Sequence, residues 1–170
     1  DESSTISLEE AFEREACLEI DKMMLQTPAR QGGDQHTLID NLTLHLRQGQ
    51  SLLIVGDSGI GKSSLLRAIA GLWLDGSGSI RRCGGNNIFF MPQRPYMCLG
   101  TLREQLLYPQ LQSSDASAGV LHEALRDVNL GHFVDRYCLD EVREWGNILS
   151  LGEQQRVNFA RVLLQPSLRL

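Results

Sequence analysis

The sequence has no long hydrophobic run, no closely spaced cysteine pair and no long basic segment. Nothing in its 170 residues approaches the roughly 18 consecutive apolar residues of a membrane helix, and no charged segment followed by an apolar one marks a signal peptide at the N-terminus. A net charge of −5 argues against a general nucleic-acid-binding surface, so no nucleic acid partner is expected. The widely spaced thiols argue against a zinc or redox motif and favour reduced cysteines that face the cytosol. These thiols are Cys17, Cys83, Cys98 and Cys138.

The composition that remains, 42% hydrophobic and 22% charged, is that of one ordinary globular domain. Its strongest motif is a glycine-rich loop between an apolar run, residues 52–55, and a helix-forming segment, residues 64–70. Glycines let the backbone adopt conformations closed to other residues, so that consecutive N–H groups can point at a phosphate chain. In this pattern Lys62 reaches the β and γ phosphates, the Ser63 hydroxyl binds Mg²⁺, and a helix that starts near Gly61 adds its unpaired amides. The sequence therefore predicts a site for a nucleoside triphosphate with Mg²⁺, formed by Gly56, Asp57, Ser58, Gly59, Ile60, Gly61, Lys62, Ser63 and Ser64.

Two further segments have defined patterns. Residues 149–156 and the apolar residues of helical spacing that follow them predict a helix that begins near Gly152. The apolar run at residues 88–91 predicts a buried strand that ends just before Gln93. In order and spacing the three motifs resemble the P-loop, the Q-loop and the signature motif of ATP-binding cassette (ABC) proteins, from about residue 17 to the C-terminus.

The resemblance implies an ATPase site shared between two domains. In ABC proteins two nucleotide-binding domains dimerise head to tail, and each ATP lies between the P-loop of one domain and the signature helix of the other. By this resemblance Lys62 and Gln93 take part in catalysis, and Ser63 and Gln93 bind Mg²⁺ beside the ATP.

The signature helix would face the γ-phosphate of the ATP held by the second domain, again with a helix N-terminus as the anion site. The expected residues are Ser150, Leu151, Gly152, Glu153 and Gln154. The sequence departs from the family pattern at Leu151, where a glycine is usual, and at Glu153, where a glutamine is frequent. Ser150 and Gly152 are therefore expected to make the main contacts. Taken alone, the segment also fits an ordinary helix with Ser150 as its N-cap.

Three segments of the sequence narrow the resemblance to one subfamily of ABC proteins. Residues 62–67, 92–96 and 100–109 are similar to subfamily D half-transporters and their bacterial relatives, which carry fatty acyl compounds, cobalamin or peptides. In such proteins a transmembrane domain, expected N-terminal in the same chain, selects the substrate. We expect a membrane-associated protein whose ATPase domain faces the cytosol and couples ATP binding and hydrolysis to transport. Two alternatives stay open: a soluble ABC ATPase of the DNA-repair or translation type, and a regulatory module in which nucleotide binding alone switches a partner.

The implied fold is the α/β P-loop NTPase fold, in its ABC form with a small antiparallel β layer and a helical subdomain at about residues 101–150. Residues 1–16 are expected to be a linker or the end of a preceding region, and residues 17–170 a partial nucleotide-binding domain. Local patterns predict a helix at residues 7–16, strands at 18–25 and 42–46, a turn at 31–34, a loop at 75–79 and a helix cap at 113–115.

Two family features are weak in the sequence. Residues 27–30, where many members place an aromatic under the adenine, contain none, so apolar contact is expected to hold the base. Beyond the sequence the family continues into the Walker B strand, with its Asp and Glu, and a switch histidine. We therefore expect a C-terminally truncated part of a longer protein that is inactive alone, because phosphoryl transfer depends on such positioning. Residues 52–55 would lack their neighbouring strand, so poor stability and weak ATP binding are also expected.

Overall fold

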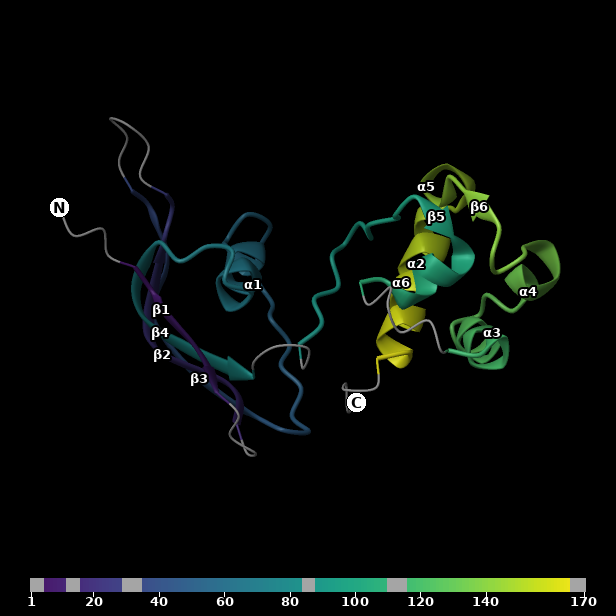
Figure 1. Ribbon diagram of the computed structural model, residues 1–170. Helices are drawn as coiled ribbons and strands as arrows, with labels where there is room; N and C mark the ends of the chain where they lie inside the picture. Colours follow the sequence, from purple (N-terminus) through teal and green to yellow (C-terminus); the bar gives the residue numbers. More distant parts are fainter. Residues whose placement is uncertain (1–4, 12–15, 29–34, 84–87, 110–115, 166–170) are drawn as a thin grey trace. The chain divides into compact units, whose positions relative to one another are not determined.

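The computed structural model describes residues 5–11, 16–28, 35–83, 88–109 and 116–165 (Figure 1). Two compact units meet in the chain where Ile88 is followed by Phe89. The first unit contains a β-sheet and one helix, and the second unit contains five helices and a two-stranded sheet in the described part of the chain. None of the helices formed by the described residues is long and apolar enough to cross a membrane.

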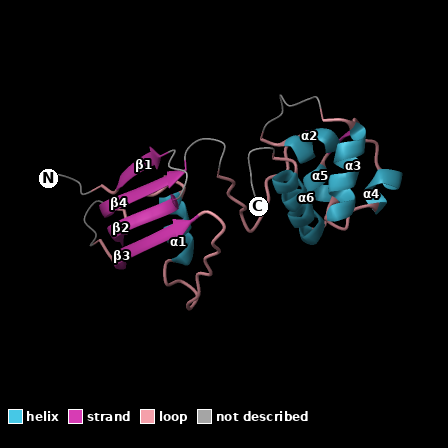
Figure 2. Cartoon of the chain, turned by 90° about the horizontal axis from the view of Figure 1, so that it is seen from below, coloured by secondary structure: helices cyan, strands magenta, loops and turns pink. Residues whose placement is uncertain are grey.

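The sheet of the first unit has the strand order β1-β4-β2-β3 (Figure 2). Strand β1 pairs with β4 in parallel, whereas β2 pairs with β3 and with β4 in antiparallel. The strands are β1 (Ser7–Ala11), β2 (Ala16–Gln26), β3 (Thr37–Arg47) and β4 (Gly76–Cys83). The small antiparallel layer and the strands predicted at residues 18–25 and 42–46 are thereby confirmed. The turn predicted at residues 31–34 lies outside the described residues.

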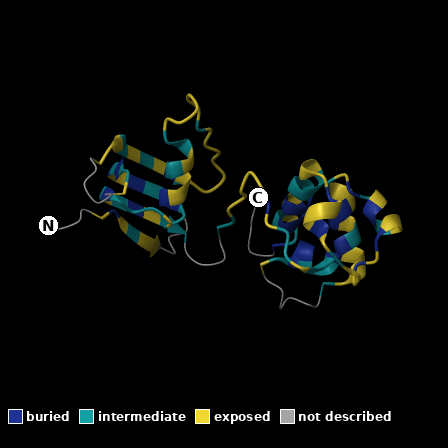
Figure 3. Cartoon of the chain, turned by 90° about the horizontal axis from the view of Figure 1, so that it is seen from above, coloured by how far each residue is buried: buried dark blue, intermediate teal, exposed yellow. Residues whose placement is uncertain are grey.

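One helix, α1 (Lys62–Ile69), packs on this sheet. Its buried residues Leu65, Ala68 and Ile69 join one apolar cluster with Ile20 and Ile80 of the sheet, both fully buried. Burial of each Leu or Ile side chain contributes about 1.5–3 kcal/mol, so the amphipathic spacing of the helix fixes which side meets the strands. Figure 3 shows where the buried residues lie in each unit.

A row of ionisable side chains crosses the strands of this sheet. The row passes through Glu9 on β1, Arg81 on β4, Glu19 on β2 and His45 on β3, with closest nitrogen–oxygen distances of 3.4, 2.9 and 4.0 Å. The hydrogen bonds that Arg81 donates to Glu19 and then to Glu9 raise the pKa of Arg81. Opposite charges on neighbouring strands stabilise a register, so this row helps to hold the parallel strand β1 in place.

Strand β1 corrects the expectation of a helix at residues 7–16. Residues Ser7–Ala11 are strand, because Leu8 pairs with Ile80 and the flanking carboxylates find arginines on β4. The helical spacing of Leu8, Ala11 and Phe12 was a local pattern, and pairing with β4 overrides it. Residues 12–15 lie outside the described part of the chain.

The prediction of a loop at residues 75–79 is also wrong, because strand β4 begins at Gly76. Gly76 has φ 139° and Gly78 has φ 92°, and a Cβ on Gly76 would collide with the carbonyl oxygen of Met24. A Cβ on Gly78 would lie 2.6 Å from the carbonyl oxygen of Lys22. These glycines therefore permit close approach of β4 to β2, a use of glycine that looks like a turn signal in the sequence.

Residues 52–55 and 88–91 are not strands, contrary to expectation. Leu53 and Val55 are 84% and 76% exposed, and Phe90 and Met91 are exposed as well. Among the described residues no strand pairs with either segment. A single segment without a neighbour has no partner for its N–H and C=O groups, so its apolar composition alone cannot make it a buried strand.

The second unit is largely helical, as predicted. Helices α2 and α3 pack against α6 around a core that includes Leu106, Leu121, Trp145 and Val157. The helix cap predicted at residues 113–115 lies outside the described residues, and the N-cap of α3 is Ser117. The elements are β5 (Gly100–Thr101), α2 (Leu102–Leu107), α3 (Ala118–Asp127), α4 (His132–Arg136), β6 (Val142–Arg143), α5 (Trp145–Ile148) and α6 (Leu151–Leu163).

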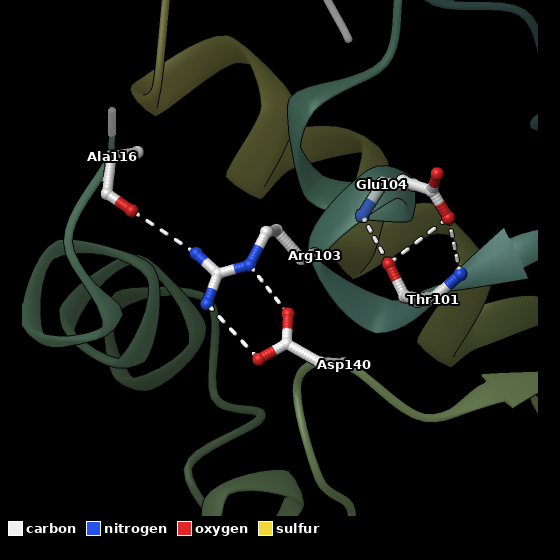
Figure 4. A network of polar contacts seen from close by, with 5 residues as sticks. All are labelled: Thr101, Arg103, Glu104, Ala116 and Asp140. Atoms are coloured by element: carbon white, nitrogen blue, oxygen red, sulfur yellow. Dashed lines mark hydrogen bonds and ion pairs between the residues drawn. The ribbon is translucent and has the colours of Figure 1, made fainter. Parts of the chain in front are cut away.

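Arg103 at the start of α2 connects three segments of this unit (Figure 4). Its Nε and Nη2 donate to the two carboxylate oxygens of Asp140 at 2.7 and 3.3 Å, and its Nη1 donates to the carbonyl oxygen of Ala116 at 3.1 Å. Hydrogen bonding from Arg103 lowers the pKa of Asp140. The forked guanidinium thus joins α2 to the chain before α3 and after α4.

Candidate nucleotide-binding site

The glycine-rich loop has the backbone geometry that its sequence predicts. Gly56, Gly59 and Gly61 have φ values of 149°, 88° and 108°, conformations that residues with a Cβ rarely adopt. Gly61 is the N-cap of α1, and the helix begins at Lys62, as expected. No side chain caps this helix, so the N–H groups of its first turn are available to an anion.

Lys62 lies across the loop that precedes it. Its Nζ donates to the carbonyl oxygens of Gly56 and Asp57 at 2.7 and 2.5 Å. The ammonium group is therefore held beside the glycine backbone, next to the unpaired amides of α1. A cation and several N–H donors at one point are a donor set for phosphate oxygens.

The other predicted loop residues leave this site open. Asp57, Ser58, Ile60 and Ser63 are exposed, and a Cβ on Gly59 would meet no atom within 4 Å. In the part of the chain that the structure describes, no group of three His, Cys, Asp or Glu side chains could hold a metal ion. The exposed Ser63 hydroxyl is an oxygen donor of the kind that Mg²⁺ takes. Ser64 is half-buried in the first turn of α1.

Gln93 belongs to the second unit, whereas Lys62 belongs to the first. Gln93 is exposed, and its backbone carbonyl oxygen accepts a hydrogen bond from Nε2 of Gln155 on α6 at 3.2 Å. The segment that carries the predicted Q-loop glutamine is therefore tied to the predicted signature helix. Beside these two segments is an open pocket of about 370 Å³, lined by Arg94, Pro95, Tyr96, Met97, Gly146 and Gln154.

The predicted signature helix is α6, which begins directly after Ser150. Ser150, Leu151 and Gly152 are exposed, and a Cβ on Gly152 would meet no atom within 4 Å. Gln154 is engaged with the segment before the helix, because its Nε2 donates to the carbonyl oxygens of Gly146 and Leu149 at 3.1 and 2.9 Å. Among the predicted signature residues, the structure thus places Ser150, Leu151 and Gly152 on an open surface and uses Gln154 to attach α6 to α5.

Glu153 closes the first turn of α6 in a capping box with Ser150. The Ser150 hydroxyl and backbone N–H both donate to Oε2 of Glu153, at 2.7 and 2.8 Å, and the Glu153 N–H donates back to the hydroxyl oxygen at 3.4 Å. The hydroxyl of Ser150, followed by its backbone N–H, lowers the pKa of Glu153, and His132 and Arg156 add smaller effects in the same direction. Glu153 therefore carries its negative charge at neutral pH.

The sequence did not point to His132 as a part of this site. Its Nε2 lies 3.7 Å from Oε1 of Glu153, the carboxylate oxygen that Ser150 does not use. A pair separated by 21 positions depends on the tertiary packing of the helical unit, and no local pattern in the sequence predicts it. Only the departure from the family pattern at Glu153 marked this position as unusual.

Comparison with known proteins agrees with the motifs. The family model described as ABC transporter matches residues 39–168. An uncharacterized ABC transporter ATP-binding protein of Synechocystis sp. is 53% identical over 128 residues, which cover 75% of this chain and 19% of that protein. ABC transporter D family member 2, chloroplastic, of Arabidopsis thaliana is 40% identical in an alignment 199 residues long, which covers 90% of this chain and 28% of that protein.

A human relative and one solved structure complete the comparison. ATP-binding cassette sub-family D member 3 of Homo sapiens is 40% identical over 150 residues, covering 85% of this chain and 22% of that protein. The structure of a bacterial Atm1-family ABC exporter with ATP bound reaches a TM-score of 0.72 at 21% identity, covering 93% of this chain and 29% of that one. This likeness concerns the fold and agrees with the predicted ABC-type P-loop NTPase fold. The chain spans between 19% and 28% of the length of the three relatives named here. The family match over residues 39–168 and relatives of 40% identity over most of the sequence show that the chain belongs to the ABC transporter family, as an ATP-binding domain similar to those of subfamily D members.

Proposed function

We propose that this domain binds ATP with Mg²⁺ and supplies half of each of two composite ATPase sites, in a transporter that uses binding and hydrolysis of ATP to move a substrate across a membrane. The observation that carries the proposal is that the N-terminus of α1 has no side-chain cap and that the start of α6, although capped by Ser150 and Glu153, lies on an exposed surface. The exposed residues at the start of α6 are Ser150, Leu151 and Gly152.

The residues have separate roles in this proposal. The loop amides and Lys62 bind the β and γ phosphates, because fixed N–H donors and a cation can replace the water around an anion. Ser63 and Gln93 take part in holding Mg²⁺, which neutralises charge on the phosphates during transfer. Ser150 and Gly152 contact the γ-phosphate bound by the second domain. ATP is thereby enclosed only when two domains come together.

The second domain is a copy of this one or a related one, arranged head to tail. A transmembrane domain, N-terminal in the same chain, would select the substrate, and the ATPase domain would face the cytosol. The relatives named above support this reading, because the human and Arabidopsis proteins are members of ABC subfamily D. The names of the relatives and the family model favour transport over a soluble ABC ATPase or a regulatory module.

The proposal can be tested by mixing two variants of the complete protein, Lys62→Ala and Ser150→Ala. A dimer with one chain of each type has one site with both changes and one site with neither, if the sites are shared head to tail. We expect each variant alone to trap no ATP, and the mixed dimer to trap one ATP. If differently tagged chains are shown to pair and the mixed dimer still traps none, the shared site is wrong.

A further inference from the structure

The Ser150 hydroxyl is already engaged in the structure. A hydroxyl has one proton, and this one is donated to Oε2 of Glu153 at 2.7 Å, the oxygen that also accepts the Ser150 N–H. A γ-phosphate that approached the start of α6 would need the same proton. The carboxylate and the phosphate are therefore competing acceptors for one donor.

Charge adds to this competition. The Glu153 carboxylate is within hydrogen-bonding distance of Ser150, so its negative charge lies beside the place where the proposed function puts a second anion. A negative charge in the first turn of a helix stabilises the helix itself. It also cancels part of the positive potential that would attract an anion to this end of the helix. Two neighbours moderate the effect: the imidazole of His132, whose Nε2 lies 3.7 Å from Oε1, and the guanidinium of Arg156, one turn further along α6.

We propose that Glu153 is a positioning residue that restrains nucleotide-driven closure, because it holds the Ser150 proton and repels the incoming γ-phosphate. This inference rests on the proposed function, since it presumes that α6 meets the ATP of a second domain. Closure then requires Ser150 to exchange its carboxylate acceptor for a phosphate oxygen. An uncharged glutamine at this position can still accept from Ser150, but it carries no charge.

The same unit contains a second capping box of the same kind, at the start of a different helix. At the start of α2, Thr101 donates from its N–H and its hydroxyl to Oε2 of Glu104 at 2.6 and 3.0 Å, and the Glu104 N–H donates back at 3.1 Å (Figure 4). A role limited to helix capping predicts that Glu153→Gln and Glu104→Gln behave alike. A role in closure predicts that Glu153→Gln changes the nucleotide concentration needed for closure and that Glu104→Gln does not.

The test uses the complete protein, labelled for energy transfer between its two nucleotide-binding domains, with Mg²⁺ and a non-hydrolysable ATP analogue. We expect Glu153→Gln to lower the analogue concentration for half-maximal closure about tenfold, which corresponds to about 1.4 kcal/mol. The difference from the wild type should shrink as salt rises from 0.05 to about 1 M, because the screening length falls to about 3 Å. Glu104→Gln should leave the concentration unchanged.

A second variant tests the charge without disturbing the cap. His132 is exposed at the first position of α4, and His132→Glu places another anion beside Glu153. We expect a several-fold higher analogue concentration for closure, again reduced by salt. The inference is overturned if Glu153→Gln closes like the wild type, if Glu104→Gln gives the same gain, or if His132→Glu has no effect. Lys62→Ala separates the two proposals, because a normal response of that variant would refute the proposed function itself.

Discussion

The Nζ atom of Lys62 donates to the carbonyl oxygen of Gly56 at 2.7 Å, so the first residue of α1 closes the loop that leads into its own helix. Both acceptors of this ammonium, Gly56 and Asp57, are neutral carbonyl groups. A phosphate oxygen carries a negative charge that a carbonyl oxygen lacks, so it adds a coulombic attraction to the hydrogen bond with the ammonium. A phosphate can therefore replace the two carbonyl oxygens, and the loop holds its cation close to where the ligand would bind.

Lys62→Ala should weaken ATP binding by the complete protein about 10- to 100-fold, since a hydrogen bond to a charged group contributes about 1.5–3 kcal/mol. Isothermal titration with ATP and Mg²⁺ measures this affinity. The control is Arg67→Ala, which removes an exposed cation from the last turn of the same helix. Equal affinities of Lys62→Ala and the wild type would contradict the role assigned to Lys62.

Gly76→Ala should destabilise the sheet far more than Gly49→Ala. Both glycines have positive φ, 139° and 78°, so both substitutions strain the backbone by about 1–2 kcal/mol. Only at Gly76 would the new methyl also collide with the carbonyl of Met24, whereas at Gly49 it would meet no atom within 4 Å. Overpacking adds about 1–3 kcal/mol. Hydrogen exchange of the amides of β2 and β4 measures the difference, and equal protection in both variants would contradict it.

The sequence predicted most reliably the features whose determinants are local. The start of α1 follows from Gly61 and Lys62, and the start of α6 follows from Ser150 with Glu153 three residues later, because capping depends on neighbours in the chain. Strand β1 depends on pairing with β4, about 70 residues away, and no local pattern shows that. Residues 52–55 show the reverse case, in which a strand-like run forms no strand without a neighbour.

The features of the candidate site also separate into those with local determinants, which the sequence predicts, and those that depend on tertiary structure. The loop and the exposed start of α6 could be located from motifs alone. The engagement of the Ser150 proton by Glu153, and the placement of His132 beside that carboxylate, depend on side-chain geometry and on the packing of α4. Gln154 illustrates the difference, since the motif assigns it to the ligand surface and the structure shows it bonded to the carbonyl oxygens of Gly146 and Leu149.

Acid should loosen the start of α6 through Glu153. Its pKa is lowered from an ordinary value of 4.5, mainly by the Ser150 hydroxyl. A carboxyl whose pKa is lower in the folded state stabilises that state fully above the ordinary value, and this contribution is lost as the pH falls through the folded-state pKa. In the wild type we therefore expect hydrogen-exchange protection of the amides in the first turns of α6 to decrease once the pH is lower than 4.5. Glu153→Gln should lack this component, and an identical acid profile of the two proteins would contradict the assignment.

Arg161 offers a prediction about the core of the helical unit. Its side chain is 2% exposed and has no carboxylate partner among the described residues. The Nε donates to the carbonyl oxygen of Gln105 at 2.6 Å, and Nη1 donates to Oδ1 of Asn158 at 3.5 Å. The guanidinium lies 5.1 Å from the centre of the Tyr108 ring, and Nη2 has no hydrogen-bond partner in the part of the chain that the structure describes. Burial lowers the pKa of this group, which shows that the protein environment disfavours its charge.

The two truncations of Arg161 should therefore differ. Arg161→Met keeps most of the volume and removes a poorly paired buried charge, so its cost should stay within about 1–2 kcal/mol, the range of a lost hydrogen bond to Gln105. Arg161→Ala leaves a cavity as well and should cost about 3–5 kcal/mol, similar to other large-to-small core substitutions. Hydrogen exchange of the α2 and α6 amides in the complete protein measures both. If Met were as damaging as Ala, the charge of Arg161 would contribute to stability, and the cation–aromatic contact with Tyr108 would have to outweigh the cost of burial.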